Sequence, residues 1–195
     1  MANGPTPLVY LLRHGETPWA ATGQHTGRTD LPLNERGEQQ ARALAPRLAA
    51  LQLDRVLCSP LQRARRTAEL AVPGLAATLD ADLAEWDYGE YEGVTTAAIR
   101  ARQPQWNLFR DGCPRGETLD AVAARADRVI ARARALGGIT LLVAHRDILR
   151  ILAMRWIGVA AIEAAHLLLD TATLGSLGYD HHSLAEPAIR SWNAG

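Results

Sequence analysis

Two short apolar segments of the chain each lead into a histidine. Leu8 to Leu12 is followed by Arg13 and His14, and Ile139 to Val143 is followed two residues later by His145. Apolar runs of this length predict buried strands. In α/β folds, ligand-binding residues collect at the carboxyl ends of strands. The two segments therefore predict an α/β fold with a site at one edge of its sheet.

Helical and extended patterns alternate along the rest of the chain. Further strands are predicted over 55–58, 171–179 and 188–192, with a short strand or extended piece over 78–83. Helices are predicted over 34–51, 59–70, 95–102, 117–136 and 147–156, and a loop over 86–93. Pro46 is expected to kink the first helix or end its first part, and Pro60 suits the first turn of the second.

This alternation predicts a three-layer α/β/α fold with a mostly parallel central sheet flanked by helices. Asn34 is the expected N-cap of the first helix. We expect one domain over residues 1–195, with 1–7 as a flexible terminus.

Composition narrows the functional classes. The 195 residues carry no net charge, so the overall charge gives no reason to expect nucleic-acid or membrane binding. All 21 basic residues are arginines, which excludes a P-loop lysine and a Schiff-base mechanism. The N-terminal apolar run is too short for a signal peptide or a membrane span. Because Cys58 and Cys113 are isolated, we expect no disulfide framework and a cytoplasmic location.

The strand-end histidines and arginines suit phosphate chemistry. An unprotonated imidazole can attack phosphorus at neutral pH, because its ordinary pKa is about 6.5. His14 is the candidate nucleophile, and Arg13 and Arg63 would both reach one phosphate if the strands that precede them are neighbours. The planar guanidinium group of arginine matches phosphate oxygens. His145 would add a further donor if it is protonated, and nothing in the pattern resembles a metal site.

A leaving alkoxide also needs a proton, and no lysine can supply it. Glu85 is the best candidate for the acid, because Trp86 and Tyr88 would partly remove it from water and raise its pKa. The residues alone leave three competing carboxylates open: Asp87, Glu90 and Glu92.

Each of these residues also has a structural interpretation. A histidine at a strand end is more often structural than catalytic, and arginines in a helix usually face solvent. The second argument applies to the run at 63–66 and to the predicted helix 117–136, where we expect Arg125, Arg128, Arg132 and Arg134 to be solvated. Only the combination of two strand-end histidines, an early-helix arginine and a loop glutamate favours a functional site.

An ordered set of short motifs belongs to a similarity that runs from about Leu8 to the C-terminal tail. In chain order they cover residues 13–17, 26–33, 58–60 with Arg63 and Thr67, 85–89 with 91–93, 116–118 and 144–145. With these motifs the chain resembles the histidine phosphatase superfamily, which includes the cofactor-dependent phosphoglycerate mutases. The resemblance implies a phosphorylated His14, a phosphate pocket completed by Arg13, Arg63 and His145, and Glu85 as proton donor. It also implies that Thr26, Gly27 and Tyr88 line the substrate site, and that no metal or other cofactor is required.

Within the superfamily, the chain is most similar to the sedoheptulose-1,7-bisphosphatase-like branch and related acid phosphatases. The similarity lies in residues 85–93, 106–113 and 179–188. It implies substrate contacts from Ser59, Arg63, Arg150 and His181. For His181 and the neighbouring His182, a surface pair or an adventitious metal site is the alternative.

Two departures from the family pattern decide between activities. Arg146 and Asp147 follow the second histidine where glycine is usual, so Arg146 either points away from the pocket or adds a cation to it. The lysine and paired arginines that the mutases use are replaced by Thr95, Thr96 and only Arg110. Water is then the expected phosphoryl acceptor, which favours a phosphatase.

The predicted function is therefore hydrolysis of small sugar phosphates or bisphosphates through a phosphohistidine. The alternatives are a phosphoglycerate mutase, a non-catalytic phospho-ligand-binding module and a phosphohistidine protein phosphatase. The segment between Glu85 and Glu117 favours a covered small-molecule pocket over the last of these. We expect a small phosphate ester as the only partner, apart from a second copy of the chain in a homodimer.

Overall fold

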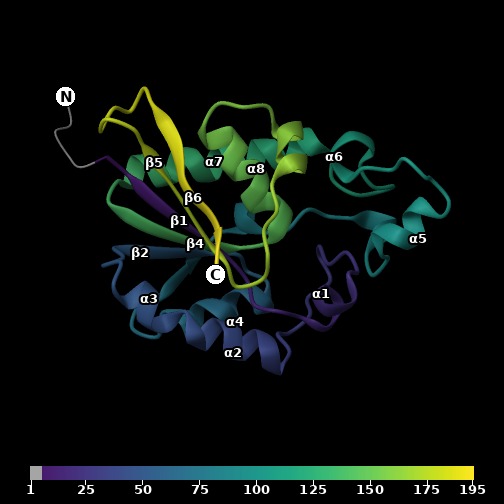
Figure 1. Ribbon diagram of the computed structural model, residues 1–195, viewed down its shortest axis with the longest axis horizontal. Helices are drawn as coiled ribbons and strands as arrows, with labels where there is room; N and C mark the ends of the chain where they lie inside the picture. The colour runs from purple at the N-terminus through teal and green to yellow at the C-terminus, as the bar shows by residue number, and fades with distance from the viewer. Residues whose placement is uncertain (1–5) are drawn as a thin grey trace.

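A computed structural model describes residues 6–195 (Figure 1). The predicted flexible terminus, residues 1–7, lies outside this range apart from its last two residues. Six strands form one sheet in the order β3-β2-β4-β1-β5-β6. The strands are β1 (Leu8–Arg13), β2 (Arg55–Cys58), β3 (Ala77–Leu79), β4 (Ile139–Ala144), β5 (Leu174–Tyr179) and β6 (Pro187–Ala194).

Helices cover both faces of the sheet and the loops at one end. The α-helices are α1 (Pro18–Thr22), α2 (Glu35–Ala43), α3 (Ala45–Ala49), α4 (Gln62–Ala71), α5 (Thr96–Arg100), α6 (Leu108–Asp111), α7 (Leu119–Leu136) and α8 (Arg146–Trp156). The 3-10 helices are η1 (Ala81–Leu83), η2 (Gly89–Tyr91) and η3 (Ala161–His166). None of the helices in this part of the chain is long and apolar enough to cross a bilayer.

The sheet is mixed but mostly parallel, as predicted. β4 pairs in parallel with both β1 and β2, and β2 pairs in parallel with β3. β5 runs antiparallel to β1, and β6 antiparallel to β5. The condition set for Arg13 and Arg63, that the strands before them are neighbours, is not met, because β4 lies between β1 and β2.

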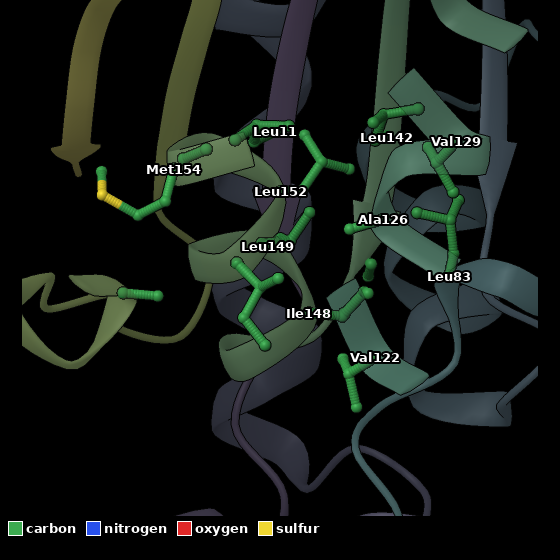
Figure 2. Packing of buried hydrophobic residues seen from close by; sticks show 14 of the residues in the cluster. Leu11, Leu83, Val122, Ala126, Val129, Leu142, Ile148, Leu149, Leu152 and Met154 are labelled. Atoms are coloured by element: carbon green, nitrogen blue, oxygen red, sulfur yellow. The ribbon is translucent and has the colours of Figure 1, made fainter. Parts of the chain in front are cut away.

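Alternation of side chains along the strands builds a separate core on each face of the sheet. On β1, Leu11 belongs to the core beneath α7 and α8, whereas Leu12 belongs to the core above α2, α3 and α4. Figure 1 shows these two helical layers on either side of the sheet. In Figure 2, Leu11 and Leu142 of the sheet face Leu152 of α8 and Val129 of α7. The predicted three-layer architecture is confirmed.

This topology places a crevice at the carboxyl ends of β1 and β4. The chain leaves β1 for the helical layer with α2, whereas it leaves β4 for the opposite layer with α8. Adjacent parallel strands whose connections diverge in this way open a crevice between them. α1, α5 and α6 gather on the right of the view, the side towards which β1 runs (Figure 1).

Local structure differs from the prediction at several element boundaries. The helix expected over 34–51 is divided at Leu44 into α2 and α3, and Pro46 lies in the first turn of α3, so it ends the first part as expected. The helix expected from Ser59 starts only at Gln62, because Leu61 is still extended before it. The segment 78–83 is the end of β3 followed by η1. The short helices α1, α6 and η3 were not predicted.

Candidate active site

Strand register brings the two strand-end histidines side by side. β1 and β4 stay paired up to Arg13 and Ala144. The backbone N–H of His14 then donates to the carbonyl oxygen of Ala144 at 3.0 Å. The imidazole rings of His14 and His145 have centroids 5.0 Å apart.

His14 is held as a neutral imidazole with one nitrogen open. Its Nδ1 lies 2.7 Å from the carbonyl oxygen of Gly15. Because a carbonyl oxygen only accepts, Nδ1 carries the proton and Nε2 presents its lone pair. Burial, followed by the charges of Arg63 and Arg13, holds the pKa of His14 well below its ordinary value. The side chain lines a cavity at the strand ends, so a nucleophilic nitrogen faces that cavity at neutral pH.

Arg13 supplies a cation to the same cavity. One of its terminal nitrogens donates to the carbonyl oxygen of Leu169, and its Nε is buried with no partner among residues 6–195. Burial and the nearby Arg146 lower the pKa of Arg13 to about 10, which leaves the guanidinium charged at neutral pH. The unpartnered Nε is a donor that an anionic ligand would satisfy.

Arg63 and His145 form a buried layer beneath the cavity. The Nε of Arg63 donates to Nδ1 of His145 at 3.1 Å, and Nε2 of His145 lies 2.7 Å from Oγ of Ser59. His145 is therefore neutral, and burial together with Arg63 keeps its pKa well below the ordinary value. The sequence alone leaves the protonation of His145 open; its hydrogen bonds in the structure require the neutral form. Ser59 is fully buried and positions His145, which corrects the prediction that it contacts substrate.

Arg63 also holds the loop that carries Thr26 and Gly27. Its terminal nitrogens donate to the carbonyl oxygens of Thr26, Gly27 and Thr29 at 2.8–3.1 Å. Thr26 lines the cavity. Gly27 does not: a Cβ there would lie 2.2 Å from the carbonyl oxygen of Trp86, so glycine permits a close approach of two backbones. Its predicted substrate contact is corrected to a structural role.

Glu85 follows η1, and its carboxylate lies against the first turn of α8 in the wall of the cavity. It accepts hydrogen bonds from its neighbour Trp86 at 2.9 Å and from the first backbone N–H groups of α8, at Asp147 and Ile148, both at 3.1 Å. Burial, reinforced by the nearby Asp147 carboxylate, raises the pKa of Glu85 to about 7. Glu85 can therefore exchange a proton close to neutral pH.

The three other carboxylates that were candidates for the acid make hydrogen bonds or ion pairs within the loops instead. Glu92 accepts the backbone N–H groups of residues 27–29 at 2.9–3.2 Å. Asp87 accepts the backbone N–H of Gly89 at 2.9 Å, and Glu90 pairs with the exposed Arg115. Unlike Glu85, none of the three lines the cavity.

Asp147 organises a buried cluster that sequence reasoning missed. Its carboxylate accepts hydrogen bonds at 2.6 Å from both the Tyr88 hydroxyl and Nη1 of Arg150. Burial opposes ionisation of Asp147, but Arg150, Arg146 and Tyr88 outweigh it and lower the pKa. The available signal was an acidic residue in the first turn of the helix after the second histidine.

Arg150 does not reach the cavity, which corrects the prediction that it contacts substrate. Besides Asp147, it donates to the carbonyl oxygen of Ala165 at 3.0 Å, and its guanidinium lies 4.8 Å from the ring centre of Phe109. The side chain is buried among these partners. Arg150 therefore positions Asp147, whereas Tyr88 lines the cavity.

Arg125 is buried, contrary to the expectation that it is solvated. Two of its nitrogens donate to Glu117 at 2.9 Å each, and a third donates to the carbonyl oxygens of Asp82 and Ala84 at 2.7 Å. Arg125 thereby ties α7 to the segment that leads into Glu85.

His181 lies at the opposite end of the sheet from His14. It follows β5, which runs antiparallel to β1 and pairs its last residues with the start of that strand. Within one chain the predicted substrate contact of His181 is therefore wrong. Its Nδ1 lies 2.7 Å from Glu186. Asp180, His181 and Glu186 form an exposed group with spacing that could hold a metal ion.

The cavity itself has a volume of about 100 Å³. Besides the predicted site residues, its walls include six polar or charged side chains: Thr17, Gln24, His25, Thr96, Arg146 and Asp147. His25 is wedged against Tyr88 and Trp106, at centroid distances of 4.8 and 5.6 Å.

A neutral histidine at a strand end, with arginines around it and a carboxylic acid in the same cavity, is an arrangement suited to phosphate chemistry in an α/β fold. The model of the histidine phosphatase superfamily (branch 1) matches residues 9–195, and the chain belongs to this family. The family expected from the sequence motifs, and with it the phosphatase class, is confirmed.

Three relatives show how the chain is related within the family. It is 40% identical to an acid phosphatase of Mycobacterium tuberculosis, over 89% of this chain and 87% of that one. It is 29% identical to sedoheptulose 1,7-bisphosphatase of Saccharomyces cerevisiae, over 94% and 92% of the two chains. It is 33% identical to a probable phosphoglycerate mutase, GpmB, of Photorhabdus laumondii, over 89% and 85%.

A solved structure shows the same fold. The product of the open reading frame Rv3214 of Mycobacterium tuberculosis is 37% identical, covers 96% of this chain and 97% of its own, and superimposes with a TM-score of 0.90.

Proposed function

We propose that the chain hydrolyses phosphate monoesters of small sugars, bisphosphates included, through a phosphohistidine on His14. One observation carries the proposal: the neutral imidazole of His14 and the carboxyl group of Glu85 line the same cavity. A nucleophile and a proton donor that share a cavity suit displacement at phosphorus. The relatives named acid phosphatase and sedoheptulose 1,7-bisphosphatase support hydrolysis and sugar bisphosphates.

In the first step, Nε2 of His14 attacks the phosphorus atom and the bond from phosphorus to the sugar oxygen breaks. Protonated Glu85 gives its proton to the leaving oxygen. The charge of Arg13, with that of Arg63 beneath the cavity, neutralises the transferring group. The hydrogen bond from Nδ1 to Gly15 keeps the imidazole oriented.

In the second step, water attacks the phosphohistidine. Glu85, now ionised, takes a proton from this water while the bond between phosphorus and Nε2 breaks. Inorganic phosphate leaves, and His14 and Glu85 return to their starting protonation states. A carboxyl group with a pKa of about 7 suits both directions of proton transfer.

A phosphate-release assay tests the proposal. Its substrates are sugar mono- and bisphosphates, phosphoglycerates and a phosphopeptide. His14→Ala is expected to abolish release, and His166→Ala, at an exposed histidine of η3, is the matched control that keeps it. Failure of the unaltered protein to release phosphate from any ester would contradict hydrolysis and favour a phospho-ligand-binding module.

A mutase is the second candidate, favoured by the relatives named as probable phosphoglycerate mutases. Incubation with 3-phosphoglycerate and its bisphosphate cofactor separates the two activities. We expect free phosphate; accumulation of 2-phosphoglycerate without phosphate release would identify a mutase instead.

The remaining expectations stay predictions. They are a single domain, a cytoplasmic location, a homodimer, and a metal-independent reaction. Sedimentation at equilibrium tests the homodimer, and unchanged phosphate release in the presence of a chelator tests metal independence.

A further inference from the structure

Arg146 adds a cation at the cavity whose charge is poorly matched within the protein. Its side chain lines the cavity together with Arg13 and His14, and 47% of it is exposed. Its ion pair with Asp147 is 4.0 Å long. That carboxylate is already bound at 2.6 Å by both Arg150 and Tyr88. Asp147 therefore has two closer partners than Arg146, and the guanidinium of Arg146 can bind a ligand.

A phosphate group alone does not account for all the positive charge at this site. A phosphate monoester carries about −1.5 to −2 charges at neutral pH. Arg13 in the cavity wall and Arg63 beneath it balance that charge. Arg146 is then a third cation, and it lies close enough to Arg13 to lower the pKa of that residue.

The rest of the substrate has to lie on the solvent side of the reacting phosphate. His14 is buried at the carboxyl end of β1, so a phosphate within reach of its Nε2 occupies the inner part of the cavity. The remainder of the ester then extends towards solvent. Arg146 lines the same cavity and 47% of its side chain is exposed, so its guanidinium lies on this solvent side.

We infer that Arg146 binds a second anionic group of the substrate, either a carboxylate or a second phosphate. The inference rests on the proposed function and narrows its substrate class to phosphate esters with two anionic groups. It also answers the question that the sequence raised: the arginine that replaces the usual glycine adds a cation to the pocket.

Matched pairs of esters test this assignment. 3-Phosphoglycerate is compared with glycerol 3-phosphate, and fructose 1,6-bisphosphate with fructose 1-phosphate. In Arg146→Ala, we expect the ratio of kcat/KM within at least one pair to fall about ten- to hundredfold, the value of a charge-assisted hydrogen bond. Arg146→Lys should keep part of the preference. Arg42→Ala, at an exposed arginine of α2 paired with Glu38, is the control and should keep the whole ratio.

The pattern of loss identifies the second group. A change in the first pair alone indicates a carboxylate, and a change in the second pair alone a second phosphate. Ratios that stay within twofold in both pairs for Arg146→Ala would overturn the inference while leaving hydrolysis intact.

A binding measurement separates this inference from the proposed function. In a His14→Ala background, calorimetry compares 3-phosphoglycerate with glycerol 3-phosphate, and the bisphosphate pair likewise, with and without Arg146→Ala. The same loss of preference is expected without any turnover. Equal preference with and without Arg146 would refute the assignment even if no ester is hydrolysed.

Discussion

Replacing Arg125 with leucine is expected to destabilise the fold by about 3 kcal/mol. Removing one partner of a buried ion pair costs about 3–5 kcal/mol, because the other charge stays behind. The Glu117 side chain that remains is 19% exposed, so water partly compensates and the lower end of that range applies. The carbonyl oxygens of Asp82 and Ala84 lose their donor as well. For a chain of 195 residues this corresponds to a fall in Tm of roughly 6–12 °C.

The assay is urea or thermal unfolding of the two proteins, with Arg128→Leu as the control. Arg128 lies one turn further along α7, is 55% exposed and pairs with Asp82, so its loss should cost less than about 1 kcal/mol. Equal losses for Arg125→Leu and Arg128→Leu would refute the reasoning. Equal losses would mean that burying the Arg125 guanidinium adds nothing to the stability that an exposed ion pair gives.

The stability difference should also depend on pH. Burial opposes ionisation of Glu117, but its hydrogen bonds with Arg125 outweigh burial and lower its pKa in the fold. The contribution of this pair is therefore present above the ordinary glutamate pKa of about 4.3 and is lost as the pH falls through the lowered value. Unfolding of both proteins at neutral and acidic pH should show the difference shrink in acid. A constant difference would exclude the ion pair as its source.

Three further predictions concern the acid and the core. Activity on alkyl phosphates should fall as the pH rises through about 7, where Glu85 loses its proton, which gives the pH–rate profile a falling limb. Glu85→Gln should lower kcat by about 10²–10⁴ and remove this limb. Asp147→Asn should move the limb to lower pH, because it removes a negative charge that raises the pKa of Glu85; an unmoved limb would exclude this coupling. Leu142→Ala, at a fully buried position of β4, should cost about 2–5 kcal/mol in urea unfolding, and a cost below 1 kcal/mol would contradict its place in the core.

Local patterns predicted the strands and the residues that end them. The apolar runs before His14 and His145 are short enough to favour strands over helices, and each leads into a histidine with an arginine beside it. Their pairing in one crevice follows from parallel strands that share a carboxyl edge. Local pattern did not predict the order of the strands, because the sequence of residues 55–58 does not indicate that β4 lies between β2 and β1.

Long-range partners explain the remaining errors. Arg125 was expected to be solvated, but it is buried in an ion pair with Glu117. Arg150 was expected to contact substrate, but it is buried in an ion pair with Asp147. Which carboxylate meets which arginine depends on helix packing, which periodicity does not encode. His181 was misplaced for a different reason: β5 is antiparallel, so its end lies at the far edge of the sheet.

Trapping the phosphorylated protein tests the central claim most directly. Rapid quench of the protein with a ³²P-labelled sugar phosphate, followed by peptide mapping, should place acid-labile label on the peptide that contains His14. His14→Ala should take up no label, and Glu85→Gln should form label more slowly. Phosphate release by the unaltered protein with no label on His14, or full activity of His14→Ala, would contradict the account.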